Sequence, residues 1–80
     1  MAPADLLARL RTRPFEPFRI VTSDGVTYDV RHPDLVLVTL GSAVVGFPDA
    51  SAPGIAARYD IVSLRHIIRL EQILPQPGAV

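Results

Sequence analysis

Two arginines and a histidine near the C-terminus are the residues of this chain best suited to binding an anion. Arg65 and His66 are adjacent, and Arg69 follows in the same segment. An arginine offers forked donors that match a phosphate, and a histidine adds a donor that titrates near neutral pH. The same residues also suit a turn with solvated arginines, which is the interpretation we favour. Arg65, His66 and Arg69 are therefore candidate contacts for a ligand or an RNA.

Residues that could perform catalysis or hold a metal are widely separated in the sequence. His32 lies beside Pro33 and Asp34, but the only other histidine is His66, and the chain has no cysteine and no Glu-x-x-His spacing. We expect His32 to serve a turn. No serine has a neighbouring base or a nucleophile elbow; the serines are Ser23, Ser42, Ser51 and Ser63. The sequence therefore predicts no enzyme, no metal site and no cofactor.

The composition indicates a small domain with surplus apolar surface. Hydrophobic residues make up 49% of the 80-residue chain, and its mean hydropathy is +0.31. A single domain over residues 1–80 buries only about 60 to 65% of its unfolded surface. Without cysteine, no disulfide can stabilise it. We therefore expect the chain to associate with copies of itself or with another protein.

The charge balance excludes some classes of partner. The formal net charge is zero, with eight arginines against eight acids and no lysine. This balance argues against a broad cationic field for nucleic acid or anionic lipid. The apolar runs are shorter than the roughly 20 residues that cross a bilayer, and the N-terminal segment lacks the pattern of a secretion signal. We expect a cytoplasmic protein with no membrane partner.

Periodicity and turn residues predict one helix followed by short strands. Pro3 and Asp5 suit a helix start and Pro14 its end, so a helix is expected at about residues 4–13. Asp24 and Gly25 predict a hairpin turn in which Gly25 has a positive φ angle. Residues 48–57 are expected to form a loop and residues 76–80 a disordered tail. The expected strands cover about residues 18–22, 26–31, 35–40, 43–47, 59–62 and 66–73.

The third predicted strand is apolar on both faces, whereas a strand in a lone small sheet usually alternates apolar with polar residues. Leu35 and Leu37 are expected in the interior. The other face of this strand is too large for one short helix to cover, so we expect a second chain to cover it. The residues predicted to form this oligomer interface are Val36, Val38 and Leu40, together with Ile68 of the last strand.

Three segments carry a resemblance to a known fold. Residues 18–25 (FRIVTSDG) couple apolar alternation to an Asp-Gly turn, residues 34–38 (DLVLV) place aliphatic residues after an acid, and residues 64–67 (LRHI) put a basic residue and a histidine before the last strand. In these segments the chain resembles the Sm-like and SH3-like small barrels. The resemblance implies a mainly β fold, a five- to six-stranded barrel over about residues 18–74 with an N-terminal α-helix. It also implies RNA binding by Arg65 and His66 at the pore of a ring.

A second resemblance involves residues 14–20, the turn at residues 23–25 and residues 30–33, which look like a group of uncharacterised bacterial proteins of about 80 residues. It implies a bacterial origin but no function. Sm-like proteins hold a base with an aromatic or amide side chain where this chain has Leu35 and Val36. We therefore predict a non-enzymatic homo-oligomeric interaction or assembly module, with Sm-like RNA binding as the alternative.

Overall fold

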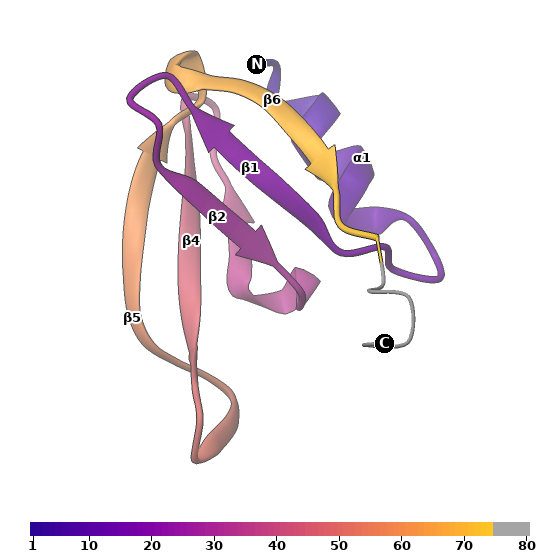
Figure 1. Cartoon of the computed structure of the whole chain (residues 1–80), viewed down its shortest axis with the longest axis vertical. Helices are drawn as coiled ribbons and strands as arrows, with labels where there is room; N and C mark the ends of the chain where they lie inside the picture. Colours follow the sequence, from indigo (N-terminus) through magenta and orange to yellow (C-terminus); the bar gives the residue numbers. More distant parts are fainter. Residues whose placement is uncertain (75–80) are drawn as a thin grey trace, which may run out of the picture.

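The computed structural model describes residues 1–74 and shows a mainly β protein with one N-terminal helix (Figure 1). The helix α1 covers Pro3–Arg11, and two 3-10 turns lie at Pro33–Leu35 (η1) and Leu64–His66 (η2). The strands are β1 (Phe18–Thr22), β2 (Thr27–Val30), β3 (Val36–Val38), β4 (Ser42–Asp49), β5 (Ala52–Ser63) and β6 (Ile67–Gln72). The tail predicted at residues 76–80 lies outside the described residues.

The strands form two antiparallel three-stranded sheets, ordered β2-β1-β6 and β3-β4-β5. In the first sheet, Ile20 of β1 pairs with Tyr28 of β2 and with Leu70 of β6. In the second, Val44 of β4 lies between Leu37 of β3 and Ile61 of β5. Over residues 1–74 no strand pairing joins the two sheets, so the predicted barrel is not seen as a closed sheet.

Both sheets turn an apolar face toward one core, which α1 helps to cover. Phe18 and Ile20 of β1 are fully buried, as is Leu6 of α1. Burying one such side chain contributes about 1.5 to 3 kcal/mol relative to leaving it in water. In Figure 1, α1 lies behind β1 and β6. The other buried members of the core are Leu10, Val30, Ala43, Val45, Val62, Leu64 and Ile67.

The helix forms as predicted but ends earlier. It begins at Pro3, where a missing N–H has no cost, and ends at Arg11 because Thr12 is already extended, with ψ 130°. The residue before Pro14 is disfavoured in the helical region, so continuation toward residue 13 is opposed. Leu6 and Leu10 are one helical turn apart and both face the core.

The first hairpin is confirmed. β1 covers the predicted residues 18–22, and in β2 the side chain of Val30 is buried while Thr27 and Asp29 are exposed. Gly25 has φ +86°, a value that side chains with a Cβ rarely adopt. The Asp-Gly pair therefore sets the turn, and with it the register of the hairpin.

The third strand turns toward the core the face that was predicted to point away from it. Val36 and Val38 pack against the core, whereas Leu37 is 65% exposed. Because both faces of this run are apolar, hydrophobicity alone did not distinguish them. The pairing of Leu37 with Val44, whose neighbours Ala43 and Val45 are buried, determines which face turns outward.

The prediction of a loop at residues 48–57 is wrong, because these residues form the far part of the β4–β5 hairpin. Pro48 pairs with Ala56, and Asp49 pairs with Ala52. The register shifts on both sides of Pro48, which is where a strand can accept a residue that lacks an N–H. The Asp49 carboxylate accepts hydrogen bonds from the Ser51 N–H and hydroxyl at 2.8 and 2.7 Å and closes the turn.

Candidate functional site

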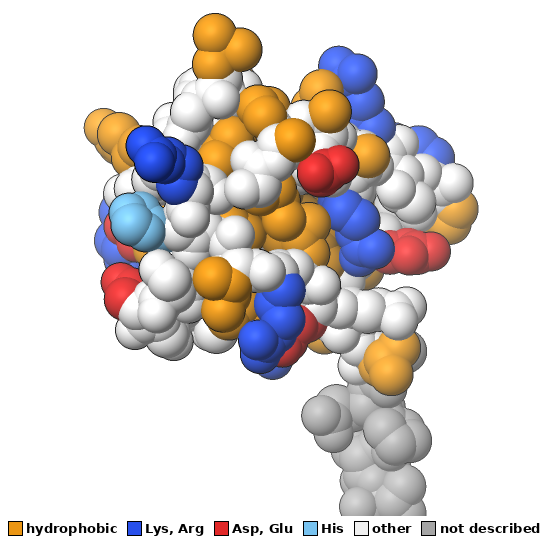
Figure 2. Space-filling view, turned by 90° about the horizontal axis from the view of Figure 1, so that it is seen from above, with side chains coloured by type: hydrophobic (Ala, Val, Ile, Leu, Met, Phe, Trp, Pro, Cys, Tyr) orange, Lys and Arg blue, Asp and Glu red, His pale blue; other side chains and the backbone are white. Residues whose placement is uncertain are grey.

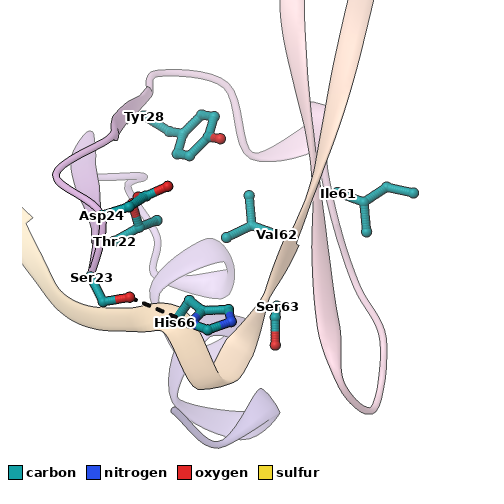
Figure 3. A pocket seen from close by; sticks show the side chains of 8 residues that line it. All are labelled: Thr22, Ser23, Asp24, Tyr28, Ile61, Val62, Ser63 and His66. Carbon is teal, nitrogen blue, oxygen red and sulfur yellow. Dashed lines mark hydrogen bonds between the residues drawn. The ribbon is translucent and has the colours of Figure 1, made fainter.

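A cavity of about 290 Å³ opens between the β1–β2 turn, η2 and the end of β5 (Figure 3). The side chain of Val62 points into it, and that of Ile61 points away. The wall therefore combines hydroxyls, a carboxylate and an imidazole with an apolar floor. The lining residues are Thr22, Ser23, Asp24, Tyr28, Ile61, Val62, Ser63 and His66.

Backbone hydrogen bonds hold the elements around this cavity together. The Ser23 N–H donates to the carbonyl of His66 at 2.8 Å, and the Leu64 N–H donates to the carbonyl of Gly41 at 3.0 Å. The Ser63 hydroxyl accepts from the Arg65 N–H at 3.3 Å and so caps η2. These bonds join η2 to both the β1–β2 turn and the β3–β4 turn.

The Asp24 carboxylate serves the turn in which it lies. The Thr22 hydroxyl donates a hydrogen bond to it, and the Val26 N–H donates at 3.3 Å. The bond from Thr22, then the backbone bond from Val26, hold the pKa of Asp24 below its ordinary value, with a smaller contribution from the nearby His66. This arrangement favours the structural role that the Asp-Gly sequence predicts.

A cluster of four side chains next to the cavity connects the two sheets: Tyr28, Phe47, Arg58 and Asp60. The Tyr28 hydroxyl donates to Asp60 Oδ2 at 2.9 Å, and burial followed by this bond raises the pKa of Tyr28. Arg58 Nη1 lies 3.3 Å from Asp60 Oδ1, and its guanidinium is 3.8 Å from the centre of the Phe47 ring. This cluster connects β2 to β5 without a backbone ladder.

The residues around the cavity do not assemble the parts of a nucleophilic site. Ser23 Oγ is 3.4 Å from His66 Nδ1, too long for a well-formed hydrogen bond. Over residues 1–74 no carboxylate forms a hydrogen bond with the His66 ring, so a base held by an acid is missing. In that same range no group of three or more histidine, aspartate or glutamate side chains is arranged to hold a metal ion.

The structure places the three predicted ligand contacts at and just beyond η2. Arg65 and His66 belong to the turn and are exposed. Arg69 lies on β6, where its Nε is 2.7 Å from Glu71 Oε2. Within residues 1–74 Arg65 forms no ion pair, so it is more available to an anion than Arg69. Figure 2 looks onto this end and shows apolar side chains at its centre with both signs of charge around them.

The predicted oligomer interface does not form one surface. Val36 and Val38 are partly buried against the core, whereas Leu40 is 95% exposed beside the β3–β4 turn and Ile68 is 56% exposed on β6. Half of the predicted set therefore packs against the core. Of the remaining two residues, Leu40 lies in the turn between β3 and β4, and Ile68 lies on β6 of the other sheet.

The structure instead exposes an apolar surface that the sequence interpretation missed. Leu37, Val44 and Ile61 lie side by side in paired strands, and Tyr59 is the next residue of β5 on the same face. Leu37, Tyr59 and Ile61 are 65%, 63% and 67% exposed. We call these four residues the outer face of the β3–β4–β5 sheet. The alternation of Tyr59 and Ile61 with Asp60 and Val62 was the available signal, but the phase of β3 was needed to use it.

Neither a protein-family model, nor a curated protein, nor a solved structure matches this chain. The described part of the chain contains no helix that is both long and apolar enough to span a membrane.

Proposed function

We propose that this chain is a non-enzymatic interaction module that associates with copies of itself in the bacterial cytoplasm. The observation that carries the proposal is the outer face, where Leu37 of β3 and Tyr59 and Ile61 of β5 stay exposed around the half-buried Val44, beside an edge of β5 that has no partner strand within residues 1–74. An exposed apolar surface next to a sheet edge is typical of a protein–protein contact. This function requires no catalytic group, metal or cofactor.

The fold class proposed with this function is the SH3-like or Sm-like small barrel. Support comes from the order of the elements: a helix, two small antiparallel sheets around one core, and a 3-10 turn before the last strand. Small barrels host many unrelated functions, so the exposed surface, and not the fold, supports the proposed function.

The test of self-association is the mass of the protein in solution. Native mass spectrometry and light scattering over a concentration series are expected to show a species heavier than the 8.7 kDa chain. Ile61→Ser, on the outer face, is expected to shift the population toward the single chain. Leu40→Ser is the matched control, because Leu40 is also exposed but lies outside this face. A mass of one chain at every concentration would refute the proposal.

Sm-like RNA binding is the second candidate, and one observation favours it. Arg65 and His66 are exposed at η2, and within residues 1–74 Arg65 has no carboxylate partner. Arginine contacts with phosphate weaken steeply as salt rises. A uridine-rich oligonucleotide should then bind at low salt, and Arg65→Ala should weaken the binding and reduce its salt slope. Absence of binding by the wild-type protein at low salt would exclude this candidate.

A further inference from the structure

The strand β5 presents the longest unpaired edge among the strands of residues 1–74. It covers Ala52–Ser63 and pairs only with β4, so its other side has no strand beyond it (Figure 1). Every residue from Pro53 to Tyr59 is exposed. The edge strands β2, β3 and β6 are shorter. An exposed edge strand is a template for pairing with another chain.

We propose that β5 pairs antiparallel with β5 of a second copy, in a register centred on Tyr59. This inference rests on the proposed self-association and specifies its geometry. The two sheets would join into one, in the order β3-β4-β5 followed by β5-β4-β3 of the partner subunit. In such a contact both subunits use the same surface, related by a two-fold axis. The assembly therefore closes as a dimer.

Symmetry restricts the registers that are possible. In an antiparallel pair, residues directly opposite each other point to the same face of the sheet. Tyr59 and Ile61 lie on the outer face, whereas Arg58 and Asp60 point toward the other sheet, where Asp60 meets Tyr28. A two-fold axis perpendicular to the sheet keeps each face on its own side. The pairing must therefore join residues of the same face, and one residue must lie opposite its own copy.

Among the remaining registers, the charges on β5 favour the one that brings opposite charges together. Centring on Tyr59 places Arg58 opposite Asp60 of the partner subunit, and by symmetry forms the same pair twice. Centring on Asp60 would place two carboxylates directly opposite each other, and centring on Arg58 would do the same with two guanidiniums. Opposite charges across a strand pair are favourable and like charges are unfavourable. Within one strand, Arg58 Nη1 is already 3.3 Å from Asp60 Oδ1. The two arginines and two aspartates of the dimer would therefore form one charge network.

The line along which the two β5 strands would pair, here called the seam, also brings apolar groups together on the outer face. Tyr59 would lie beside Tyr59 of the partner subunit, and aromatic pairs are among the favourable cross-strand neighbours. The register shift of the β4–β5 hairpin leaves Ala57 as an extra residue in β5. Because this bulge shortens the regular part of the seam, the dimer is expected to be weak and to dissociate on dilution.

The first experiment reverses charges and then recombines the variants. Arg58→Asp alone and Asp60→Arg alone each place like charges across the seam, so each is expected to raise the dissociation constant at least about tenfold. An equal mixture of the two variants restores opposite charges and should form a mixed dimer by native mass spectrometry. Arg69→Asp is the matched control, since Arg69 is 58% exposed against 65% for Arg58 and also pairs with an acid two residues on.

The second experiment uses the absence of cysteine from the chain. Opposite residues in an antiparallel pair have Cα atoms about 4.5 or 5.5 Å apart, within disulfide reach. Tyr59→Cys should therefore give a covalent dimer on mild oxidation. In the same register Ile61 is about 13 Å from Ile61 of the partner subunit, so Ile61→Cys should not. This measurement remains decisive if Asp60→Arg, which loses the bond from Tyr28, does not fold.

The outcomes separate this inference from the proposed function. A wild-type protein with the mass of one chain at every concentration would overturn both. A wild-type oligomer that Arg58→Asp leaves intact, or that cross-links through Ile61→Cys in place of Tyr59→Cys, would overturn the β5 register alone. A mixed dimer from two dissociated variants, together with cross-linking at Tyr59→Cys only, would support it.

Discussion

At the scale of single residues, the β1–β2 turn shows how a local sequence determines a local conformation. Gly25 supplies the positive φ angle, and Asp24 receives hydrogen bonds from Thr22 and Val26. Both roles depend on residues within the turn, so they were accessible from the sequence. The contact between Ser23 and His66 could not be predicted from the sequence, because it joins residues that are far apart along the chain.

Gly25→Val is expected to lower the free energy of unfolding by about 1 to 2 kcal/mol. Within residues 1–74, apart from Gly25 and its chain neighbours, no atom lies within 4 Å of the Cβ position at Gly25, so the cost comes from the backbone angle and not from a clash. Gly41→Val is the control, because that site is equally open but lacks the positive φ angle, and its effect should stay within about 0.5 kcal/mol. Urea denaturation measures both. Equal effects at the two glycines would contradict the conformational explanation.

Asp24→Asn should reduce stability at neutral pH and flatten its decline in acid. The pKa of Asp24 is lower in the folded state than its ordinary value. The contribution of the carboxylate is therefore present above about pH 4 and lost as the pH falls through the folded-state pKa. Urea midpoints from pH 7 to pH 2 test this. Asp34→Asn is the control, as Asp34 is exposed and forms no ion pair within residues 1–74. An unchanged acid slope in Asp24→Asn would contradict the prediction.

At the scale of elements, β1 and β3 show when the pattern of apolar residues determines which face of a strand turns toward the core, and when it does not. β1 carries Phe18 and Ile20 into the core as part of a hairpin whose register the turn sets. β3 is apolar throughout, and its orientation depends on pairing with β4. One residue of shift along a strand reverses every side chain, so a short apolar strand takes its phase from its neighbour.

Ile20→Ala should lower the free energy of unfolding by about 2 to 5 kcal/mol, because Ile20 is fully buried. Leu37→Ala should change the stability of a single chain by less than about 0.5 kcal/mol, since Leu37 is 65% exposed. Chemical denaturation at a concentration low enough to leave single chains compares the two. A large loss in Leu37→Ala would mean that β3 faces the core with Leu37.

At the scale of the whole molecule, the domain is small and its two sheets are joined mainly by the core and by side chains. Tyr28, Phe47, Arg58 and Asp60 connect β2 to β5 where no backbone ladder does. A core of this size supplies limited stability. Association through β5 and the outer face would add to it.

The thermal midpoint of the wild-type protein should therefore rise with protein concentration, because dimerisation stabilises only the folded state. Arg58→Asp should remove most of this dependence, whereas Arg69→Asp should keep it. Differential scanning fluorimetry over a hundredfold range of concentration measures the trend. A midpoint independent of concentration in the wild-type protein would contradict the prediction.

The amino-acid sequence by itself determined the helix, the first hairpin, the turn at Gly25 and the mainly β class. Each of these follows from interactions between residues close together along the chain. It did not determine the phase of β3 or the nature of residues 48–57, where Pro48 indicated a loop but lies at a bulge. Nor did it reveal the outer face, which requires Leu37, Val44 and Ile61 to be neighbours in three paired strands. Only the tertiary structure decided these features, because strand pairing brings together residues whose separation along the chain carries no local signal.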